Sequence, residues 1–200
     1  MEEEIKKTPP KKISGLWELV RFAILALLIV IPIRAFIAQP FIVRGDSMVP
    51  TFENDQYLIV DEISYRFSNP QRGYVIVFRY PKDQKKFFIK RIIGLPGETI
   101  RINGGVVIIK NSEFPDGFNL PEPYIKDKGN NELEFVLKEE EYFVMGDNRN
   151  ASSDSRYWGS LPQKLIVGKA FLRLLPINNI DIMPGDFNLD VSSIKEETVN

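Results

Sequence analysis

The longest predominantly apolar pattern in the chain lies near its N-terminus, over residues 20–37. A helix of this length rises roughly 27 Å, against about 30 Å for the hydrocarbon core of a bilayer. Residues 22–33 show no polar face at helical spacing, which argues against a helix buried in a soluble domain. Ala35 and Ala38 are separated by two residues instead of one, which argues against a cleaved leader segment. The pattern therefore predicts a retained transmembrane anchor over residues 16–38.

The charges that flank this span predict its orientation. Four lysines precede it, whereas only Arg34 and Arg44 follow it closely. Loops on the cytoplasmic side carry the excess of lysine and arginine, so residues 1–15 are expected to form a cytoplasmic tail. The preceding lysines are Lys6, Lys7, Lys11 and Lys12. The chain is thus expected to cross the lipid bilayer of a cell membrane once, with its remaining residues on the extracytoplasmic side.

Beyond the span, short runs rich in valine, isoleucine, phenylalanine and tyrosine are separated by turn signals, a pattern typical of β-strands. Asn103-Gly104-Gly105 is a strong hairpin signal, and no long amphipathic helices alternate with the runs, so a parallel α/β fold is not expected. The runs are 57–61, 74–78, 87–93, 106–109, 141–145 and 166–174. The sequence predicts a mostly β domain over residues 39–180, with a loop inserted near 111–131 and a polar tail over 181–200.

The composition excludes several kinds of chemistry. The 200 residues include no cysteine and no histidine, so a Ser-His-Asp triad, a Cys-His dyad, a Cys or His zinc site and a disulfide are all excluded. Any catalysis must use hydroxyl, carboxylate, amine or amide groups, and no metal or other cofactor is expected. With 26 Lys and Arg against 27 Asp and Glu, the formal charge is -1, so no overall field attracts nucleic acid.

A candidate nucleophile lies in a turn sequence shortly after the span. Gly45 and Pro50 favour a sharp turn that would expose the hydroxyl of Ser47. In a chain without histidine or cysteine, such a hydroxyl is one of the few groups that could attack a substrate. The same residue types more often form an ordinary polar turn, so the local pattern is weak by itself.

A candidate base lies in the run over residues 87–93. In a strand, Phe88, Lys90 and Ile92 share one face, which is apolar apart from the amine. Loss of hydration lowers the pKa of a lysine from about 10.4, and a pKa near 8 would let the amine accept a proton at neutral pH. A solvent-facing lysine on an edge strand explains the pattern equally well, so both interpretations stay open.

A third polar segment, residues 145–156, gathers carboxylates, arginines, an amide and hydroxyls in one loop. Asp154 and Arg156 could pair and make the loop rigid, while Ser152 or Ser155 could offer a hydroxyl to a nearby amine. Alternatively, these are ordinary turn residues and the pair is a surface ion pair that contributes little. Composition alone does not separate the two interpretations.

Taken in order behind an apolar span, these segments resemble the type I signal peptidase family, the membrane-anchored Ser-Lys endopeptidases. Short motifs occur singly by chance, whereas four in this order behind a span do not. The resemblance covers about residues 16–176 and includes Glu122-Pro123-Tyr124-Ile125. Its pieces are the anchor ending near Arg34-Ala35-Phe36, then GDSMVPT at 45–51, KRIIGLPG at 90–97 and GDNRNASSDSR at 146–156.

The resemblance implies an antiparallel β catalytic domain of the signal-peptidase type, and a serine endopeptidase that removes N-terminal signal peptides from secreted precursors. It implies cleavage after small residues at the first and third positions before the bond, through an acyl-enzyme. Ser47 would be the nucleophile, with its backbone N–H binding the oxyanion, and Lys90 would be the general base. Ser152 would orient the lysine amine. The residues that would structure the site are Asp147, Asp154 and Arg156.

Two positions depart from the family pattern, and two other functions compete. Gly45 stands where some members carry a second oxyanion donor, and Asn150-Ala151 stands where many have Asp-Asn. A self-cleaving Ser-Lys protein of the repressor type shares the fold, but the apolar span argues against it. A catalytically inactive, membrane-tethered β domain that binds exported proteins is the other alternative. The presence of both Ser47 and Lys90 argues against that alternative.

Overall fold

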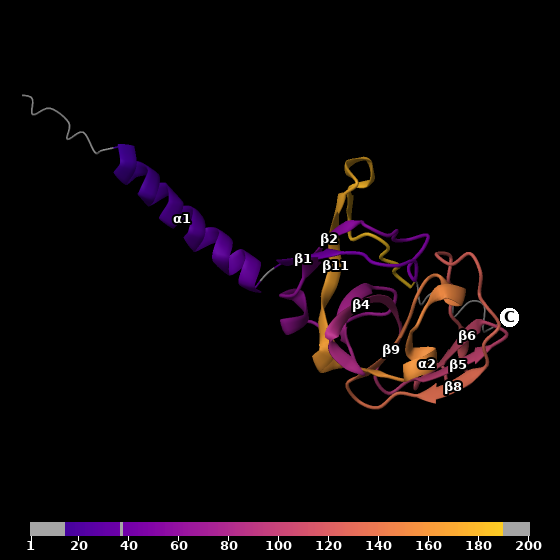
Figure 1. Ribbon diagram of the computed structural model, residues 1–200. Helices are drawn as coiled ribbons and strands as arrows, with labels where there is room; N and C mark the ends of the chain where they lie inside the picture. The colour runs from indigo at the N-terminus through magenta and orange to yellow at the C-terminus, as the bar shows by residue number, and fades with distance from the viewer. Residues whose placement is uncertain (1–14, 37, 190–200) are drawn as a thin grey trace, which may run out of the picture. The chain divides into compact units, whose positions relative to one another are not determined.

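The chain divides into two compact units, residues 1–37 and 38–200. The structure is a computed structural model that describes residues 15–36 and 38–189, with side chains given for 15–31 and 39–189. The first unit contains one helix, α1 (Gly15–Phe36; Figure 1). Its large apolar side chains are exposed from Leu16 to Ile31. No helix in the described ranges is long and apolar enough to cross a membrane. A spanning role for residues 16–38 therefore stays a prediction.

The second unit is built from two antiparallel sheets, which contain the strands that the apolar runs predict. In the larger sheet the strand order is β1-β2-β11-β3-β4-β9-β10, and β12 pairs with β11. Its strands are β1 (Ala38–Ile42), β2 (Tyr57–Asp61), β3 (Val75–Tyr80), β4 (Asp83–Gly94), β9 (Glu141–Met145), β10 (Leu161–Pro162), β11 (Ile166–Leu175) and β12 (Asp181–Ile182). The mostly β, antiparallel fold predicted from the sequence is confirmed.

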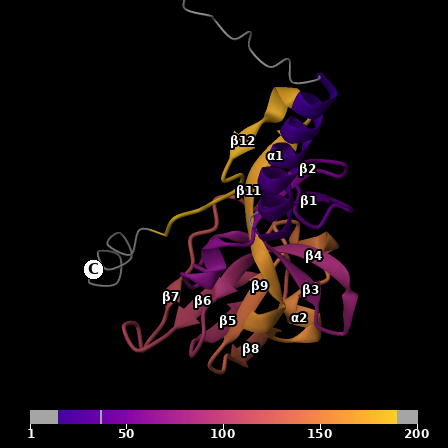
Figure 2. The same ribbon diagram turned by 90° about the vertical axis from the view of Figure 1, so that its left-hand side faces the viewer.

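The smaller sheet has the order β7-β6-β5-β8, and Figures 1 and 2 place β5, β6 and β8 at the end of this unit away from β1 and β2. Its strands are β5 (Thr99–Asn103), β6 (Val106–Lys110), β7 (Phe118–Asn119) and β8 (Leu133–Val136). Asn103 pairs with Val106 across a two-residue turn in which Gly104 and Gly105 have φ of 54° and 77°. Such a turn needs positive φ at both central residues, which confirms the predicted hairpin.

Short helices connect the strands and carry parts of the polar loop. They are η1 (Ser64–Arg66), η2 (Arg149–Ala151), α2 (Ser155–Trp158), η3 (Gln163–Leu165) and η4 (Ile177–Asn179). Asp154 caps α2, because its side chain accepts a hydrogen bond from the backbone N–H of Arg156. The segment that follows Met145 is therefore ordered helical and turn structure instead of a loose connection.

Three segments differ from the sequence-based expectation. Ala38 begins a strand instead of ending an anchor, and the loop predicted near residues 111–131 contains the short strand β7. The polar tail predicted from residue 181 is packed as far as 189: Asp186 pairs with Lys169 at 2.5 Å, and the side chain of Leu189 packs on the core of the smaller sheet. A buried ammonium needs an acidic partner, which explains why this part of the chain is held in place.

Candidate active site

Ser47 lies in the turn between β1 and β2, and buried apolar side chains hold that turn. Met48 and Phe52 are fully buried in a cluster that also contains Val43, Leu58, Val75 and Ala170. Burying a side chain of this size contributes about 2 kcal/mol, so the residues that follow the serine fix its position. Gly45 adopts a φ of 84°, and its backbone N–H donates to Asn54 Oδ1 at 2.9 Å. The turn thus presents the Ser47 hydroxyl on a rigid support.

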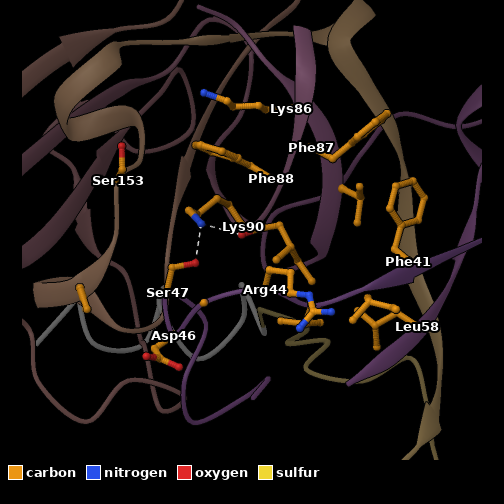
Figure 3. A pocket seen from close by; sticks show the side chains of 16 residues that line it. Phe41, Arg44, Asp46, Ser47, Leu58, Lys86, Phe87, Phe88, Lys90 and Ser153 are labelled. Carbon is orange, nitrogen blue, oxygen red and sulfur yellow. Dashed lines mark hydrogen bonds between the residues drawn. The ribbon is translucent and has the colours of Figure 1, made fainter. Parts of the chain in front are cut away.

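Lys90 lies on β4, opposite Ile76 of β3, and points inward. Only 4% of its surface is exposed. Its Nζ donates to Ser47 Oγ at 2.7 Å and to the Ile89 carbonyl oxygen at 2.8 Å, as Figure 3 shows. The interpretation of Lys90 as a solvent-facing lysine on an edge strand is therefore wrong, and the apolar face of the strand does bury the amine.

Burial lowers the pKa of Lys90 to about 8, although the carboxylates of Asp154 and Asp147 act in the opposite direction. The apolar surroundings disfavour the charged form more than these two carboxylates favour it. At pH 7 about one molecule in ten then holds the amine in its neutral form, compared with fewer than about one in a thousand for an ordinary lysine. The amine beside Ser47 can therefore accept a proton near neutral pH.

Gly146, at the start of the polar loop, lies against both serines of the site. A Cβ built on Gly146 would overlap Ser152 Oγ and the Ser47 carbonyl oxygen. Asn148 holds the same turn from the loop side, because its backbone N–H donates to the Ser47 carbonyl and its side-chain amide donates to the Asp46 carbonyl, each at 3.0 Å. Ser152 Oγ is buried and, within the part of the chain that the structure describes, has no hydrogen-bond partner.

Gly146→Ala is expected to lower kcat by about 100-fold or more, because the new methyl group must push apart Ser152 and the Ser47 backbone. The measurement is steady-state peptide cleavage by the purified variant, alongside its melting temperature. Gly15→Ala is the matched control, because nothing lies within 4 Å of a Cβ built there. Wild-type kcat in a folded Gly146→Ala variant would contradict the close packing described here.

Two buried ion pairs fix the polar loop: one joins it to strand β4, and the other lies within the loop. Arg91, the neighbour of Lys90 on β4, donates from Nε to Asp147 Oδ1 at 2.8 Å and from Nη2 to Asp147 Oδ2 at 2.5 Å. Arg156 makes the same bidentate contact with Asp154, from Nε to Oδ1 and from Nη2 to Oδ2, each at 2.8 Å. These side chains are at most 2% exposed, so the interpretation of Asp154–Arg156 as a weak surface pair is wrong. Removing one member of such a pair would leave a buried charge unpaired.

A cavity of about 480 Å³ opens beside the two residues, lined by both charged and apolar side chains (Figure 3). Lys90 and Ser47 lie at one side of it, and the rest of its wall is largely aromatic and aliphatic. The apolar lining residues include Phe41, Ile42, Val43, Leu58, Val77, Phe87, Phe88 and Ile89. A cavity of this size accepts several side chains of an extended peptide.

The structure brings together the sequence-predicted site residues Ser47 and Lys90, and places Ser152 against Gly146 next to them. Three residues that hold the loop carrying Ser152 had no role predicted from the sequence: Arg91, Asn148 and Arg149. A usable signal existed for Arg91, because a charged residue in the middle of an apolar strand requires a buried partner.

Comparisons with known proteins identify the family of the chain. A sequence profile of the family described as "Signal peptidase, peptidase S26" matches residues 16–175. The chain is similar to "Probable signal peptidase I-1" of Synechocystis sp., with 39% identity over 172 residues that cover 80% of this chain and 85% of that protein. It is also similar to signal peptidase I of Leptolyngbya laminosa, with 37% identity over 86% of this chain and 85% of that protein. A crystal structure of a signal peptidase I from Enterococcus faecalis V583 is 31% identical and covers 51% of this chain and 97% of that one, with a TM-score of 0.43. The chain therefore belongs to the signal peptidase family, peptidase S26, and is an endopeptidase of that family.

Proposed function

We propose that this protein removes N-terminal signal peptides from exported precursors with a Ser47–Lys90 dyad, through an acyl-enzyme. The observation that carries the proposal is the 2.7 Å contact between Lys90 Nζ and Ser47 Oγ. The contact lies beside a largely apolar cavity, where burial lowers the pKa of the lysine to about 8. A hydroxyl and an amine so placed are a nucleophile and its activating base.

The reaction begins when the neutral amine of Lys90 takes the proton of the Ser47 hydroxyl as Oγ attacks the scissile carbonyl carbon. The resulting ammonium then gives that proton to the leaving amine, and the peptide C–N bond breaks to leave an ester on Ser47. In the second half, Lys90 takes a proton from water as the water oxygen attacks the ester carbonyl. The proton returns to Ser47 Oγ as the ester C–O bond breaks, which restores the enzyme.

Ser152 is the residue we propose to orient the Lys90 amine. A neutral amine has two N–H donors and one lone pair. The Ile89 carbonyl accepts one N–H at 2.8 Å, and a second acceptor would direct the lone pair at Ser47. The buried Ser152 Oγ, without a partner in the described ranges, is an acceptor beside Gly146 that supports this role. A hydroxyl left unbonded in this way costs about 1–3 kcal/mol, which favours a functional explanation.

The oxyanion of the tetrahedral intermediate is proposed to bind the backbone N–H of Ser47. Among the residues that the structure describes, no recorded hydrogen bond uses this N–H, so it is available to a ligand. Gly45 supplies no side-chain donor, and its own N–H is already bonded to Asn54. One well-placed donor of this kind contributes about 3 kcal/mol to the transition state.

The wall of the cavity supports cleavage after small apolar residues. Phe41, Leu58 and Phe87 line the cavity with apolar surface, where a charged or long polar side chain would lose hydration. Alanine at the first and third positions before the bond would fit this surface at little cost.

Helix α1 is proposed to hold the enzyme on the cell membrane by a single span over residues 16–38. Its exposed apolar side chains, from Leu16 at 73% to Ile31 at 58%, have no cover in a protein core. A helix that is apolar on all sides needs an apolar environment. The lysines that precede it support a cytoplasmic N-terminus and an extracytoplasmic peptidase unit.

The orientation can be tested because the chain contains no cysteine. Phe67 is 85% exposed in the peptidase unit, so Phe67→Cys is expected to react with a membrane-impermeant maleimide added to intact cells. Lys7→Cys is expected to react only after the cells are permeabilised. Labelling of Lys7→Cys alone in intact cells would contradict the orientation and the role in export together.

The activity itself is tested with the full chain purified in detergent and a precursor that carries an Ala-x-Ala junction. Wild type is expected to release the signal peptide at that junction, as identified by mass spectrometry, while Ser47→Ala releases none. Ser68→Ala is the matched control, because Ser68 is an exposed serine outside the site. Binding of the precursor without cleavage by wild type would favour the inactive tethered domain. Cleavage of the enzyme's own chain alone would favour the repressor-type alternative.

A further inference from the structure

Residues 122–131, called the strap below, lie over the polar loop at residues 146–156 and contact it at three places. The strap belongs to the stretch predicted as an inserted loop, and its sequence is rich in turn residues. Three arginines each contact both the strap and a residue of the polar loop: Arg91, Arg149 and Arg156. The mechanism proposed above gives this segment no task.

Glu122 makes the most buried of these contacts. Its carboxylate pairs with Arg149, with Nη1 and Oε2 at 3.1 Å, and the two side chains are 3% and 1% exposed. Arg149 in turn donates from Nε to the Gly146 carbonyl at 3.3 Å. Gly146 is the residue packed against both Ser47 and Ser152. A short path of direct contacts therefore runs from the strap to the nucleophile.

Tyr124 reaches the site by a second path. Its ring lies 3.8 Å from the guanidinium carbon of Arg91, within the range of a cation–π contact. Arg91 holds both carboxylate oxygens of Asp147, which directly follows Gly146. The hydroxyl of Tyr124 donates to Glu122 at 3.2 Å, so the two paths are joined on the strap.

Two further contacts close the outer edge of the strap. The Asn150 side-chain amide donates to Asp127 Oδ2 at 2.7 Å, and Arg156 donates to Asn131 Oδ1 at 2.7 Å. The first contact accounts for the departure at position 150. An aspartate there would set a carboxylate against Asp127, whereas asparagine supplies the donor that the carboxylate needs.

We infer that the strap positions the polar loop at residues 146–156, and that Glu122 is the principal positioning residue of the strap. Glu122 acts on Ser47 and Ser152 through Arg149 and Gly146. The inference rests on the proposed Ser47–Lys90 chemistry. Loosening the strap lets Gly146 and Ser152 drift from the productive geometry. The cost falls mainly on kcat, because strands β1 to β4 and the turn that carries Ser47 supply most of the cavity that binds the peptide, and the polar loop adds Ala151 and Ser153.

The test compares Glu122→Gln with Glu98→Gln in the purified full chain. Glu98 is a matched control: it forms a buried ion pair with Arg72 at 2.5 Å, with side chains 7% and 9% exposed, and its hydrogen bonds go to Leu95 and Asn111. Glu122→Gln is expected to lower kcat at least about tenfold with KM within about threefold. Glu98→Gln, with a comparable fall in melting temperature, is expected to keep kcat within about twofold.

Three outcomes of this comparison overturn the inference: kcat of Glu122→Gln within twofold of wild type, equal losses in both variants, or a loss that lies mainly in KM. Failure of wild type to cleave any precursor would overturn the proposed function instead, so the two failures are distinguishable. All cleavage is followed with the Ala-x-Ala precursor at saturating and at low concentration, which separates kcat from KM.

The exposed pair Asn150–Asp127 provides a second test of the inference if Glu122→Gln does not fold. Asn150→Asp sets two carboxylates together and is expected to lower kcat about threefold at low salt. Adding Asp127→Asn exchanges donor and acceptor and is expected to bring kcat back to about the wild-type value. Unchanged kcat in Asn150→Asp, or no recovery in the double variant, overturns the inference.

Discussion

Lys90→Arg is expected to be as inactive as Lys90→Ala, with kcat for precursor cleavage at least about 10⁴-fold below wild type. The substitution keeps a positive charge and a hydrogen-bond donor next to Ser47, so it separates the base role of Lys90 from a purely electrostatic one. A guanidinium stays protonated at any pH the enzyme tolerates and has no lone pair with which to accept the Ser47 proton. The nucleophile would then remain a neutral hydroxyl at every pH.

The measurement is initial-rate cleavage over a long time course, which detects slow turnover. Lys164→Arg is the control, because Lys164 is exposed on η3, outside the site. Circular dichroism and melting temperature confirm that the variants are folded. Cleavage by Lys90→Arg at more than a thousandth of the wild-type rate would remove Lys90 from the base role and require another proton acceptor near Ser47.

Local patterns were sufficient to predict the elements whose causes are local. The run over residues 87–93 predicted a strand, and β4 (Asp83–Gly94) contains it, although the run alone left open whether the Lys90 amine is buried. The turn at Gly104-Gly105 follows from the left-handed conformation that only certain residues tolerate. In both cases the signal lies within a few residues of the feature that it predicts.

Strand β5 (Thr99–Asn103) was not predicted, although its burial alternates with Ile100 and Ile102 inward. Only two apolar positions mark it, and although it forms a hairpin with β6, its second partner, β8, follows some thirty residues later. Strand β1 (Ala38–Ile42) was hidden for the opposite reason, because its apolar residues continue directly from the run that precedes them. Short strands of this kind depend on their partners more than on their own composition.

Most contacts that organise the site could not be predicted from local sequence patterns, because they join residues that are distant in the sequence. Glu122 meets Arg149 across 27 positions, and Arg91 meets Asp147 across 56. In the sequence, each residue of these two ion pairs is indistinguishable from an ordinary charged residue of a loop or strand. Only the folded chain shows that they are buried together, where removing one partner carries a large penalty.

The pH dependence of kcat/KM is expected to rise tenfold per unit below pH 7 and to level off near pH 8 to 9. The chain has no histidine, so the rising limb must report another group. Burial lowers the pKa of Lys90 to about 8, and the neutral amine is the active form. The fraction of active enzyme therefore grows with pH until the pH passes that value, and kcat/KM at pH 6 should be about 100-fold below the plateau.

Two variants test whether burial and orientation of Lys90 set this profile. The ring of Phe88 lies 5.5 Å from Lys90 Nζ, so Phe88→Ser, which admits water to the amine, is expected to move the midpoint of the limb to higher pH by about half a unit. Ser152→Ala is expected to lower kcat/KM about tenfold at every pH while moving the midpoint less, because it removes the acceptor that we propose to orient the amine and leaves the apolar surroundings in place. A carboxylate base would instead put the rise near pH 4 and give a flat profile from pH 6 to 9. A flat wild-type profile over that range, measured with a precursor that stays soluble throughout, would contradict Lys90 as the base even if Ser47 proved essential.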